Sequence, residues 1–565
     1  MKKTKYIIFF SAFIFLFGAC SEEFLEVENR NSFAEEEFYS SISEFQLALN
    51  SCYAPLQGIY AFNAQFLQLG FSDRILHERS TIDPLLITSS TDFVGDIWRN
   101  LYFGYYRVNK FILEITDTDV FEGNVETRNL MEAQARALRG MYNFIATTYY
   151  DRPIFYNEES FPQNLSKDFA NGEPIQFYEQ IEEDLNFAIN YLPIEWESDD
   201  DLGRITKGGA SALLGKALIF KHYYIYGRNN EIGSAANTED LQKAKEALED
   251  VMTYGYELIM PQDEPGTNEP SREDYLYAYL SNFSYVNLVT PGGNEYKAEN
   301  NAESVWEVQY SDVFARNPFL PGWMSTGNLN HQYFSPAGSF KNIEWHPEYF
   351  YHFEETGPLD FDRDPRAYAC CFIDGDIMDY RPGFNFYNTP YNSFSHSKLF
   401  AFNRKIPGVG AGAPINTISF GFKKHNFPPL SSSDDVSINP EVSPNNWRLI
   451  RYAEVLLLYS EVTLLLNQDM GAGLDALNQV RARMGMPAIA NLTRDAVIAE
   501  RDNELGGELK RYMDLVRWGM DPSWNIDYVE IFGDNRFRRN KNEFLPIPIR
   551  EIQLNDGELV QNPGY

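Results

Sequence analysis

TKGGASALLGKALIFKHYYIY (206–226) and TEDLQKAKEALEDVMTY (238–254) are the two stretches that decide the fold of this chain. Both carry apolar residues at intervals of three and four, the spacing that places them on one face of an α-helix. The first stretch has small residues that allow another helix to approach closely: Ala210, Ala212, Gly215 and Ala217. The second supplies a matching face: Ala244, Ala247, Leu248 and Val251. The sequence therefore predicts an antiparallel helical hairpin.

Helical periodicity extends upstream over most of the first 260 residues. It is clear in 129–150 and 178–192, and short breaks at Pro193, Gly203 and Gly227 separate the helical stretches. Antiparallel helix pairs that recur along a chain are typical of tetratricopeptide-like solenoids, although no strict repeat of about 34 residues is present. We therefore expect a mainly α fold built from degenerate tetratricopeptide-like helix pairs.

The pattern changes between about 261 and 445, where proline, glycine, asparagine and aromatic residues crowd together. Such residues break long helices and leave loops with a few short strands. Long loops inside a folded protein are usually functional. Helical patterns return in 446–466, 471–484 and 493–518. The middle of the chain is therefore the expected ligand-binding region.

The N-terminal stretch MKKTKYIIFFSAFIFLFGAC (1–20) indicates where the protein works. Three lysines precede an apolar run from Tyr6 to Phe17, and small residues follow before Cys20. This is the pattern of a bacterial lipoprotein signal peptide, after whose removal Cys20 becomes the lipidated first residue. The run is short for a transmembrane helix, which needs about 20 apolar residues, so an uncleaved anchor is the less favoured alternative. Ser21-Glu22-Glu23, which places acidic residues directly after Cys20, resembles an export signal of surface lipoproteins.

These patterns give an expected domain organisation. Residues 1–19 are the signal peptide, and residues 20–565 form one domain. Its parts in chain order are helical repeats at about 32–260, the loop-rich binding region at about 261–445, further helices at about 446–520 and a C-terminal segment at 521–565.

Acidic residues outnumber basic ones by 81 to 47, which gives a formal net charge of −34. Removal of residues 1–19 takes away three lysines and leaves −37. Such a surface repels phosphate backbones, which argues against nucleic acid as a partner. Of the remaining cysteines, Cys52 stands alone and Cys370 and Cys371 are adjacent, so no C-x-x-C metal spacing exists. Three buried thiols are expected, with a bridge from Cys52 to one of the pair as the alternative.

Several motifs resemble the SusD/RagB family of outer-membrane nutrient-binding lipoproteins. Those similar to its C-terminal helices are RYAEVLLLYSE (451–461), ALNQVRAR (476–483), ERDNEL (500–505) and RYMDLVRWG (511–519). Those similar to its usual ending are FLPIPIREI (544–552) and QNPGY (561–565). Similar motifs upstream are WRNLYFGYYRVN (98–109), EAQARALR (132–139), DRP (151–153) and DPR (364–366). The resemblance covers nearly the whole mature chain.

This resemblance implies a SusD-like α-α superhelix of tetratricopeptide-like helix pairs that supports an irregular binding region. The implied partner is a SusC-like TonB-dependent barrel transporter, over whose mouth the lipoprotein sits as a lid. The implied cargo is an oligosaccharide, although some members carry peptides, and the implied location is the outer membrane, facing the exterior. The chain departs from the family at Gly506-Gly507, where bulkier residues are usual, which leaves the local helix geometry open.

Aromatic residues gather in 314–353 and 380–402. Sugar rings offer an apolar C–H face and a hydroxyl rim, so flat rings with polar tips suit them. Within sequence broken by glycine and proline, Trp323, Trp345 and Tyr349 are the candidates for ligand contact. Burial in the core is the alternative for each of them, because aromatic side chains carry much of the burial energy of any fold.

A second candidate set is Asp73, Arg74 and His77, in an irregular segment before the helix that contains Trp98. The family resemblance implies ligand contacts from the loop at this point of the chain, and a solvated charged turn is the alternative. Trp98 matches a packed aromatic of the family, so we expect it in the core.

Enzyme motifs are absent: the sequence has no H-E-x-x-H, no G-x-S-x-G and no G-x-x-x-x-G-K-[ST]. Alternating acidic residues in 360–364 resemble the start of a calcium loop, but Pro365 stands where that loop needs glycine. Glu500, Glu504 and Glu508 have helical spacing, which favours a salt-bridge ladder over a catalytic acid pair. We therefore expect no catalysis, no cofactor and no metal.

Three functions are compatible with these observations. The first is a non-catalytic surface lipoprotein that binds a glycan and passes it to a barrel transporter. The second is a helical-repeat lipoprotein of the same uptake type that binds peptides or proteins, for which helix pairs are equally suitable. The third, and least expected, is a surface glycoside hydrolase.

Overall fold

The computed structural model describes residues 38–60, 72–77, 87–161, 169–310, 343–373, 375–376, 390, 420–425, 444–532 and 537–565. Contacts divide the chain into two units, Met1–Leu47 and Ala48–Tyr565. All of the strands, and every helix from α4 (Asp92–Thr116) onward, belong to the second unit. Helices are its main elements, so the expected mainly α class is confirmed.

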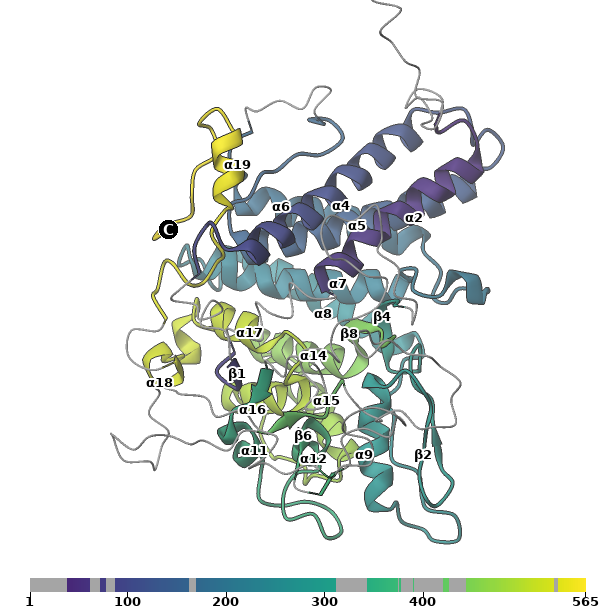
Figure 1. Cartoon of the computed structure of the whole chain (residues 1–565), viewed down its shortest axis with the longest axis vertical. Helices are drawn as coiled ribbons and strands as arrows, with labels where there is room; N and C mark the ends of the chain where they lie inside the picture. The colour runs from purple at the N-terminus through teal and green to yellow at the C-terminus, as the bar shows by residue number, and fades with distance from the viewer. Residues whose placement is uncertain are drawn as a thin grey trace, which may run out of the picture. The chain divides into compact units, whose positions relative to one another are not determined.

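The first half of the chain is built mainly from long helices. They are α2 (Ile42–Gly58), α4, α5 (Val125–Tyr150), α6 (Pro174–Tyr191), α7 (Lys207–Lys221) and α8 (Ala235–Thr253). From α4 onward each helix packs on the next (Figure 1). Several begin at a residue that caps free backbone N–H groups. The Thr206 hydroxyl accepts a hydrogen bond from the Gly209 N–H at 3.2 Å, and the Ser234 hydroxyl accepts one from the Asn237 N–H at 3.2 Å.

The predicted hairpin is the α7–α8 pair. A Cβ atom added to Gly215 would lie 2.6 Å from Leu248 Cγ, so the close approach of the two helices requires glycine at this position. Ala210 and Ala244 are completely buried, as expected from their place on the facing surfaces. A π-helical turn, His222–Gly227, extends α7 at its C-terminal end. The hairpin prediction is confirmed.

The C-terminal helices are α14 (Tyr452–Leu466), α15 (Met470–Arg483), α16 (Arg494–Leu505) and α17 (Arg511–Trp518), and α14 packs on both α15 and α8. The start of the expected helix 446–466 is instead a strand, β8 (Trp447–Arg451). It pairs antiparallel with β4 (Ser304–Val308), a partner too distant in sequence for local patterns to reveal. The expected helix 493–518 is two helices, because the chain turns at Gly507 with a φ of +78°.

Four short strands form a second structural feature, which we call the short-strand platform. They are β1 (Ile75–His77), β5 (Ile343–Trp345), β6 (Cys371–Phe372) and β7 (Gly421–Phe422). β1 pairs antiparallel with β5, and β6 with β7. A backbone bridge joins the two pairs, because the Trp345 N–H donates to the Phe420 carbonyl oxygen at 2.8 Å and the Phe420 N–H donates back at 3.3 Å.

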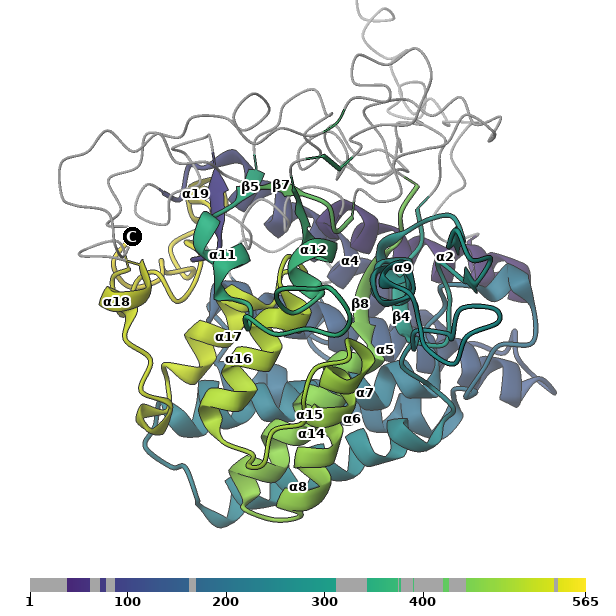
Figure 2. The same cartoon turned by 90° about the horizontal axis from the view of Figure 1, so that it is seen from below.

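The platform is where distant parts of the loop-rich region meet. The chain leaves the platform after Phe372 of β6 and returns to the platform at Phe420. Earlier in the sequence, it enters the platform at Ile343, the first residue of β5. Figure 2 shows β5 and β7 on one side of the unit, next to α11 (Pro347–His352) and α12 (Arg366–Cys370), with α14 and α8 toward the other. The platform therefore holds the ends of the loops that the sequence marks as functional.

Smaller elements complete the unit. They are α9 (Arg272–Leu280), the hairpin β2 (Leu288–Val289) and β3 (Glu295–Tyr296), α18 (Tyr528–Phe532) and α19 (Ile549–Leu554). Trp98 is 3% exposed, which confirms its place in the core. Cys52, Cys370 and Cys371 are buried and unbridged, as expected. In the part of the chain that the structure describes, no helix has the length and apolarity to cross a bilayer.

Candidate functional site

Trp345 lies inside the short-strand platform and is completely buried. Its indole stacks between the rings of Tyr349 and Phe422, with centroid distances of 4.0 Å on both sides and interplanar angles of 13° and 11°. The indole Nε1 donates to the Cys370 carbonyl oxygen at 2.8 Å. Tyr349 is equally buried. Both faces of the indole are covered by protein rings, so the structure corrects the prediction: Trp345 and Tyr349 build the platform and present no ring to a ligand.

Other predicted residues have different outcomes. Trp323 and Cys20 lie outside the described residues, so the ligand contact of the first and the lipidation of the second stay predictions. His77 lies in β1, where its backbone is in register with Ile343, and the structure describes nothing of its side chain.

Asp73 and Arg74, directly before β1, belong to a partly buried ion cluster. Arg511 Nε donates to Asp73 Oδ1 at 3.0 Å, and Arg74 Nε donates to Asp502 Oδ2 at 2.9 Å. Burial opposes ionisation of Asp502, but Arg511 and Arg74 outweigh it and lower the pKa of this carboxyl. The cluster fastens the start of β1 to α16 and α17. The solvated-turn alternative is therefore wrong for Asp73 and Arg74, and ligand contact by the pair stays a prediction.

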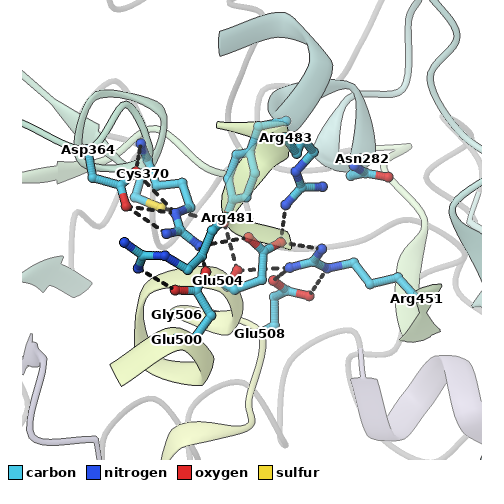
Figure 3. A network of polar contacts seen from close by, with 12 residues as sticks. Asn282, Asp364, Cys370, Arg451, Arg481, Arg483, Glu500, Glu504, Gly506 and Glu508 are labelled. Atoms are coloured by element: carbon cyan, nitrogen blue, oxygen red, sulfur yellow. Dashed lines mark hydrogen bonds and ion pairs between the residues drawn. The ribbon is translucent and has the colours of Figure 1, made fainter. Parts of the chain in front are cut away.

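Glu504 is the centre of a larger buried network (Figure 3). It accepts hydrogen bonds from Arg451 at 2.6 Å, from Arg366 at 3.1 Å and from Arg483. Arg451 also donates twice to Glu508, at 2.8 Å. All five side chains are less than 5% exposed. Burial raises the pKa of Glu504, but the three arginines outweigh this and hold it well below its usual value, so the carboxylate stays charged.

The network ties the platform to the helices. Lys424, which follows β7, donates to Glu508 at 2.7 Å and to the Gly506 carbonyl oxygen at 2.8 Å. Arg366 at the start of α12 donates to Glu500 at 2.5 Å. Ion pairing of these glutamates was expected, but as a ladder along one helix, whereas their partners come from other elements. Each carboxylate is ion-paired with arginine or lysine side chains, whereas the two carboxyl groups of a glycoside hydrolase must be accessible to the sugar.

Tyr351 lies next to the platform and exposes its side chain to solvent. It lies on α11 and is 63% exposed. Its ring packs edge to face against Phe420, and the Arg363 guanidinium lies 5.6 Å from the ring centroid. Next to it, burial lowers the pKa of His352, so this imidazole is uncharged at neutral pH. An exposed ring beside a guanidinium and a neutral imidazole suits the apolar face and hydroxyl rim of a sugar. Sequence patterns alone could not separate Tyr351 from its buried neighbours.

Metal ligation has no support among these groups. Within the described ranges, no cluster of three or more His, Cys, Asp or Glu side chains is arranged to hold an ion. Asp364, part of the calcium-like pattern, is fully buried and accepts hydrogen bonds from the Arg366 guanidinium at 2.6 and 3.1 Å.

Comparison with known families decides what kind of protein carries this arrangement. A model described as SusD family matches residues 295–565, and one described as starch-binding associating with outer membrane matches residues 23–219. The chain belongs to the SusD family. A relative from Formosa agariphila, SusD-like protein P25, is 24% identical over an alignment of 593 residues that covers 98% of each chain. A SusD-like protein from Bacteroides ovatus is 24% identical, covering 89% of this chain and 80% of the relative.

Solved structures show that the fold is SusD-like. A laminarin-binding SusD-like protein has a TM-score of 0.67 at 23% identity, covering 93% of this chain and 100% of the other. Surface glycan-binding protein A from Bacteroides thetaiotaomicron, solved with laminarihexaose, has a TM-score of 0.63 at 21% identity and the same coverage. SusD-family proteins are non-catalytic binding proteins, so the expectation that this chain is not an enzyme is confirmed by its family.

Proposed function

We propose that this SusD-family protein captures a nutrient glycan at the outer face of the outer membrane and delivers it to a SusC-like TonB-dependent transporter. The observation that carries the proposal is the extent of the family likeness, which covers 98% of the chain in one relative. Two solved proteins of the same fold are named for laminarin or were solved with laminarihexaose. Laminarin is a glucan, so a glycan is the cargo class with direct support among the relatives.

The geometry of the platform supports capture without chemistry. The ring stack of Trp345 and the hydrogen-bond network around Glu504 hold its strands in position. An exposed ring beside these strands, such as Tyr351, therefore needs little rearrangement to contact a ligand. Binding then costs little ordering entropy. Lipidation at Cys20 would keep the loaded protein beside the transporter mouth, where the local concentration of cargo is high. The carboxylates of the network are occupied by cations, so none of them is free to cut the glycan.

Affinity electrophoresis tests the proposal directly. The protein is run through gels that contain laminarin, starch or no polysaccharide, and we expect retardation in at least one glycan gel. Chain length of the recovered glycan should be unchanged. Retention of a peptide library with no retention of glycans would overturn the cargo class, and release of new reducing ends would overturn passive binding.

The location and the partner need separate tests. A Cys20→Ala variant should leave the membrane fraction, whereas the wild type stays with it. Mild detergent extraction of the lipidated wild type should copurify a barrel transporter of the outer membrane. A wild-type protein that partitions into the soluble fraction would contradict the lipid anchor.

A further inference from the structure

A cavity of about 310 Å³ lies between α2, the loop that precedes α7, and β4, in elements different from those of the platform. Its volume is at the lower end of the range for small-molecule sites, about 300–1,000 Å³. Besides the carboxylates of Asp200 and Glu307, the polar and aromatic lining consists of two rings, three amides and one cation: Tyr53, Trp306, Asn50, Gln57, Gln309 and Arg204. None of them is among the contacts expected from the sequence.

The amide groups of this cavity are held in fixed orientations. Gln309 Nε2 donates to Asn300 Oδ1 at 3.0 Å, and Gln309 Oε1 accepts from Asn446 Nδ2 at 2.8 Å. Gln57 Nε2 donates to the Gln309 carbonyl oxygen at 2.8 Å. Because the hydrogen bonds come from three elements, the polar wall is formed before any ligand binds, which lowers the entropy cost of binding.

The opposite wall is equally constrained. Gln134 Oε1 accepts hydrogen bonds from the Tyr53 hydroxyl at 3.0 Å and from Arg204 at 3.1 Å. Arg204 also donates to Asn50 Oδ1 at 2.9 Å and to Asp201 Oδ1 at 2.6 Å. The Tyr53 ring and the guanidinium therefore have set positions at the cavity.

Part of the cavity wall is formed by the backbone of Gly203. It has a φ of +85°, and its carbonyl oxygen accepts a hydrogen bond from Trp306 Nε1 at 3.3 Å. A Cβ atom at this position would lie 2.3 Å from Gln309 Cγ. Glycine is thus required both by the conformation and by the close contact with the amide wall.

The charges at the cavity oppose an anionic ligand. An acidic stretch, EWESDDD (195–201), leads into the lining residues Asp200 and Leu202. Arg204 is the sole cation among the lining residues that the structure describes, and it pairs with Asp201. Sulfate, phosphate and uronate groups would meet this acidic rim without a free cation to compensate them.

We propose that this cavity binds a neutral sugar residue and forms a glycan subsite separate from the platform. The half-buried Tyr53 ring can stack on the C–H face of a sugar, Trp306, which is 3% exposed, supports the wall behind it, and fixed amides can exchange hydrogen bonds with the sugar hydroxyl groups. The inference rests on the proposed function, since it takes the ligand class to be a glycan. It adds that the cargo is uncharged and that the helical side of the protein takes part in holding it.

Paramagnetic labelling locates the sugar without disturbing the core. Leu202 is 53% exposed at the cavity, and Ile232, in the loop before α8, is 41% exposed and serves as the control position. Each is changed to cysteine and labelled with a nitroxide in a Cys20→Ala background, where the other three cysteines are buried. With laminarihexaose and maltohexaose as neutral probes, the label of Leu202→Cys should broaden the sugar proton signals several-fold more than the label of Ile232→Cys. An oligogalacturonate should show no broadening with either label.

A cavity-filling pair of variants supplies affinities. Ala54→Trp places an indole in the cavity, and Ala236→Trp places one on the exposed first turn of α8. Ala54→Trp should weaken binding of the neutral probe about tenfold, with no change for Ala236→Trp. Equal broadening from the two labels, or broadening of the oligogalacturonate signals by the Leu202→Cys label, would overturn the subsite even if Ala54→Trp failed to fold. If the protein binds a glycan but the labels and variants have no effect, the subsite is overturned and the proposed function stands. If the wild type binds no glycan, both the subsite and the proposed function are overturned.

Discussion

Arg451 binds two groups of Glu504: its Nη1 donates to the carboxylate Oε1 at 2.6 Å and its Nη2 donates to the backbone carbonyl oxygen at 2.8 Å. Arg451 is the last residue of β8 and Glu504 lies in the last turn of α16. The same carboxylate accepts from Arg366, which begins α12 beside the platform. Strand β8 and helix α12, which lies beside the platform, are therefore both bound to the buried carboxylate of Glu504.

Glu504→Gln should destabilise the protein strongly. The amide keeps the shape of the side chain but removes the negative charge that faces Arg366, Arg451 and Arg483. Breaking a buried ion pair from one side costs about 3–5 kcal/mol, because the partner charges stay buried without compensation. Urea denaturation at pH 7 measures the change. Glu239→Gln removes an exposed partner of Lys243 and should leave the midpoint almost unchanged; equal midpoints for both variants would contradict the buried role of Glu504.

Trp345→Ala and Tyr351→Ala should separate stability from binding. Trp345 is fully buried in a ring stack, so its truncation should lower the free energy of unfolding by about 3–5 kcal/mol. Tyr351 is 63% exposed, so its truncation should leave the melting temperature nearly unchanged and weaken retention in glycan gels. Thermal melts and affinity electrophoresis of both variants make the comparison. An unchanged melting temperature for Trp345→Ala would return that residue to the candidate ligand contacts.

Local patterns predict the parts of the fold that depend on neighbours in sequence. The α7–α8 hairpin follows from small residues such as Gly215, whose partner Leu248 lies in the next helix. Trp345 could not be placed in this way, because the ring that covers one of its faces belongs to Phe422. Whether an aromatic side chain is core or surface is decided by such distant contacts, and a single sequence does not show them.

Charged residues show the same limit. Arg511 and Asp73 form a hydrogen-bonded ion pair although 438 positions separate them. Seen alone, Asp73-Arg74 has the composition of a solvated turn. The family resemblance correctly gave the class of fold, yet it could not tell which loop residues face a ligand, because the motifs that carry it are the buried helices and their ion pairs.

Glu299→Gln should alter the dependence of stability on pH. Burial raises the pKa of Glu299 from 4.5 to about 8, and the nearby Glu307 adds to the shift. Between these values the folded state keeps a proton on Glu299 that the unfolded state has lost. The free energy of unfolding therefore falls as pH rises through this window.

Glutamine mimics the protonated side chain and can still accept the Asn446 N–H hydrogen bond. The variant should have a flatter stability profile and exceed the wild type in free energy of unfolding by about 4 kcal/mol at pH 8, because each pH unit between the two pKa values contributes about 1.4 kcal/mol. Urea titrations at pH 5, 6.5 and 8 give the profiles. Parallel profiles for the two proteins would show that Glu299 ionises normally in the folded state.

Gly507→Ala should be destabilising, whereas Gly471→Ala should not. Gly507 has a φ of +78°, and a Cβ atom there would lie 3.1 Å from both Phe422 Cε1 and Trp345 Cη2. Strain and crowding against the ring stack should together cost about 1–3 kcal/mol. Gly471 lies in the first turn of α15, and no atom would lie within 4 Å of a Cβ added there. Because alanine has the higher helix propensity, Gly471→Ala should raise the free energy of unfolding by about 0.5 kcal/mol.

Both variants are measured by urea denaturation against the wild type, and the contrast tests why α16 ends where it does. Gly506-Gly507 allows the backbone to pass close to the rings of Trp345 and Phe422, so that the Gly506 carbonyl oxygen accepts a hydrogen bond from Lys424. If the two alanine variants had equal free energies of unfolding, the contact of residue 507 with the rings of Trp345 and Phe422 would not contribute to stability. Loss confined to Gly507→Ala would show that the end of α16 and the ring stack are one structural unit.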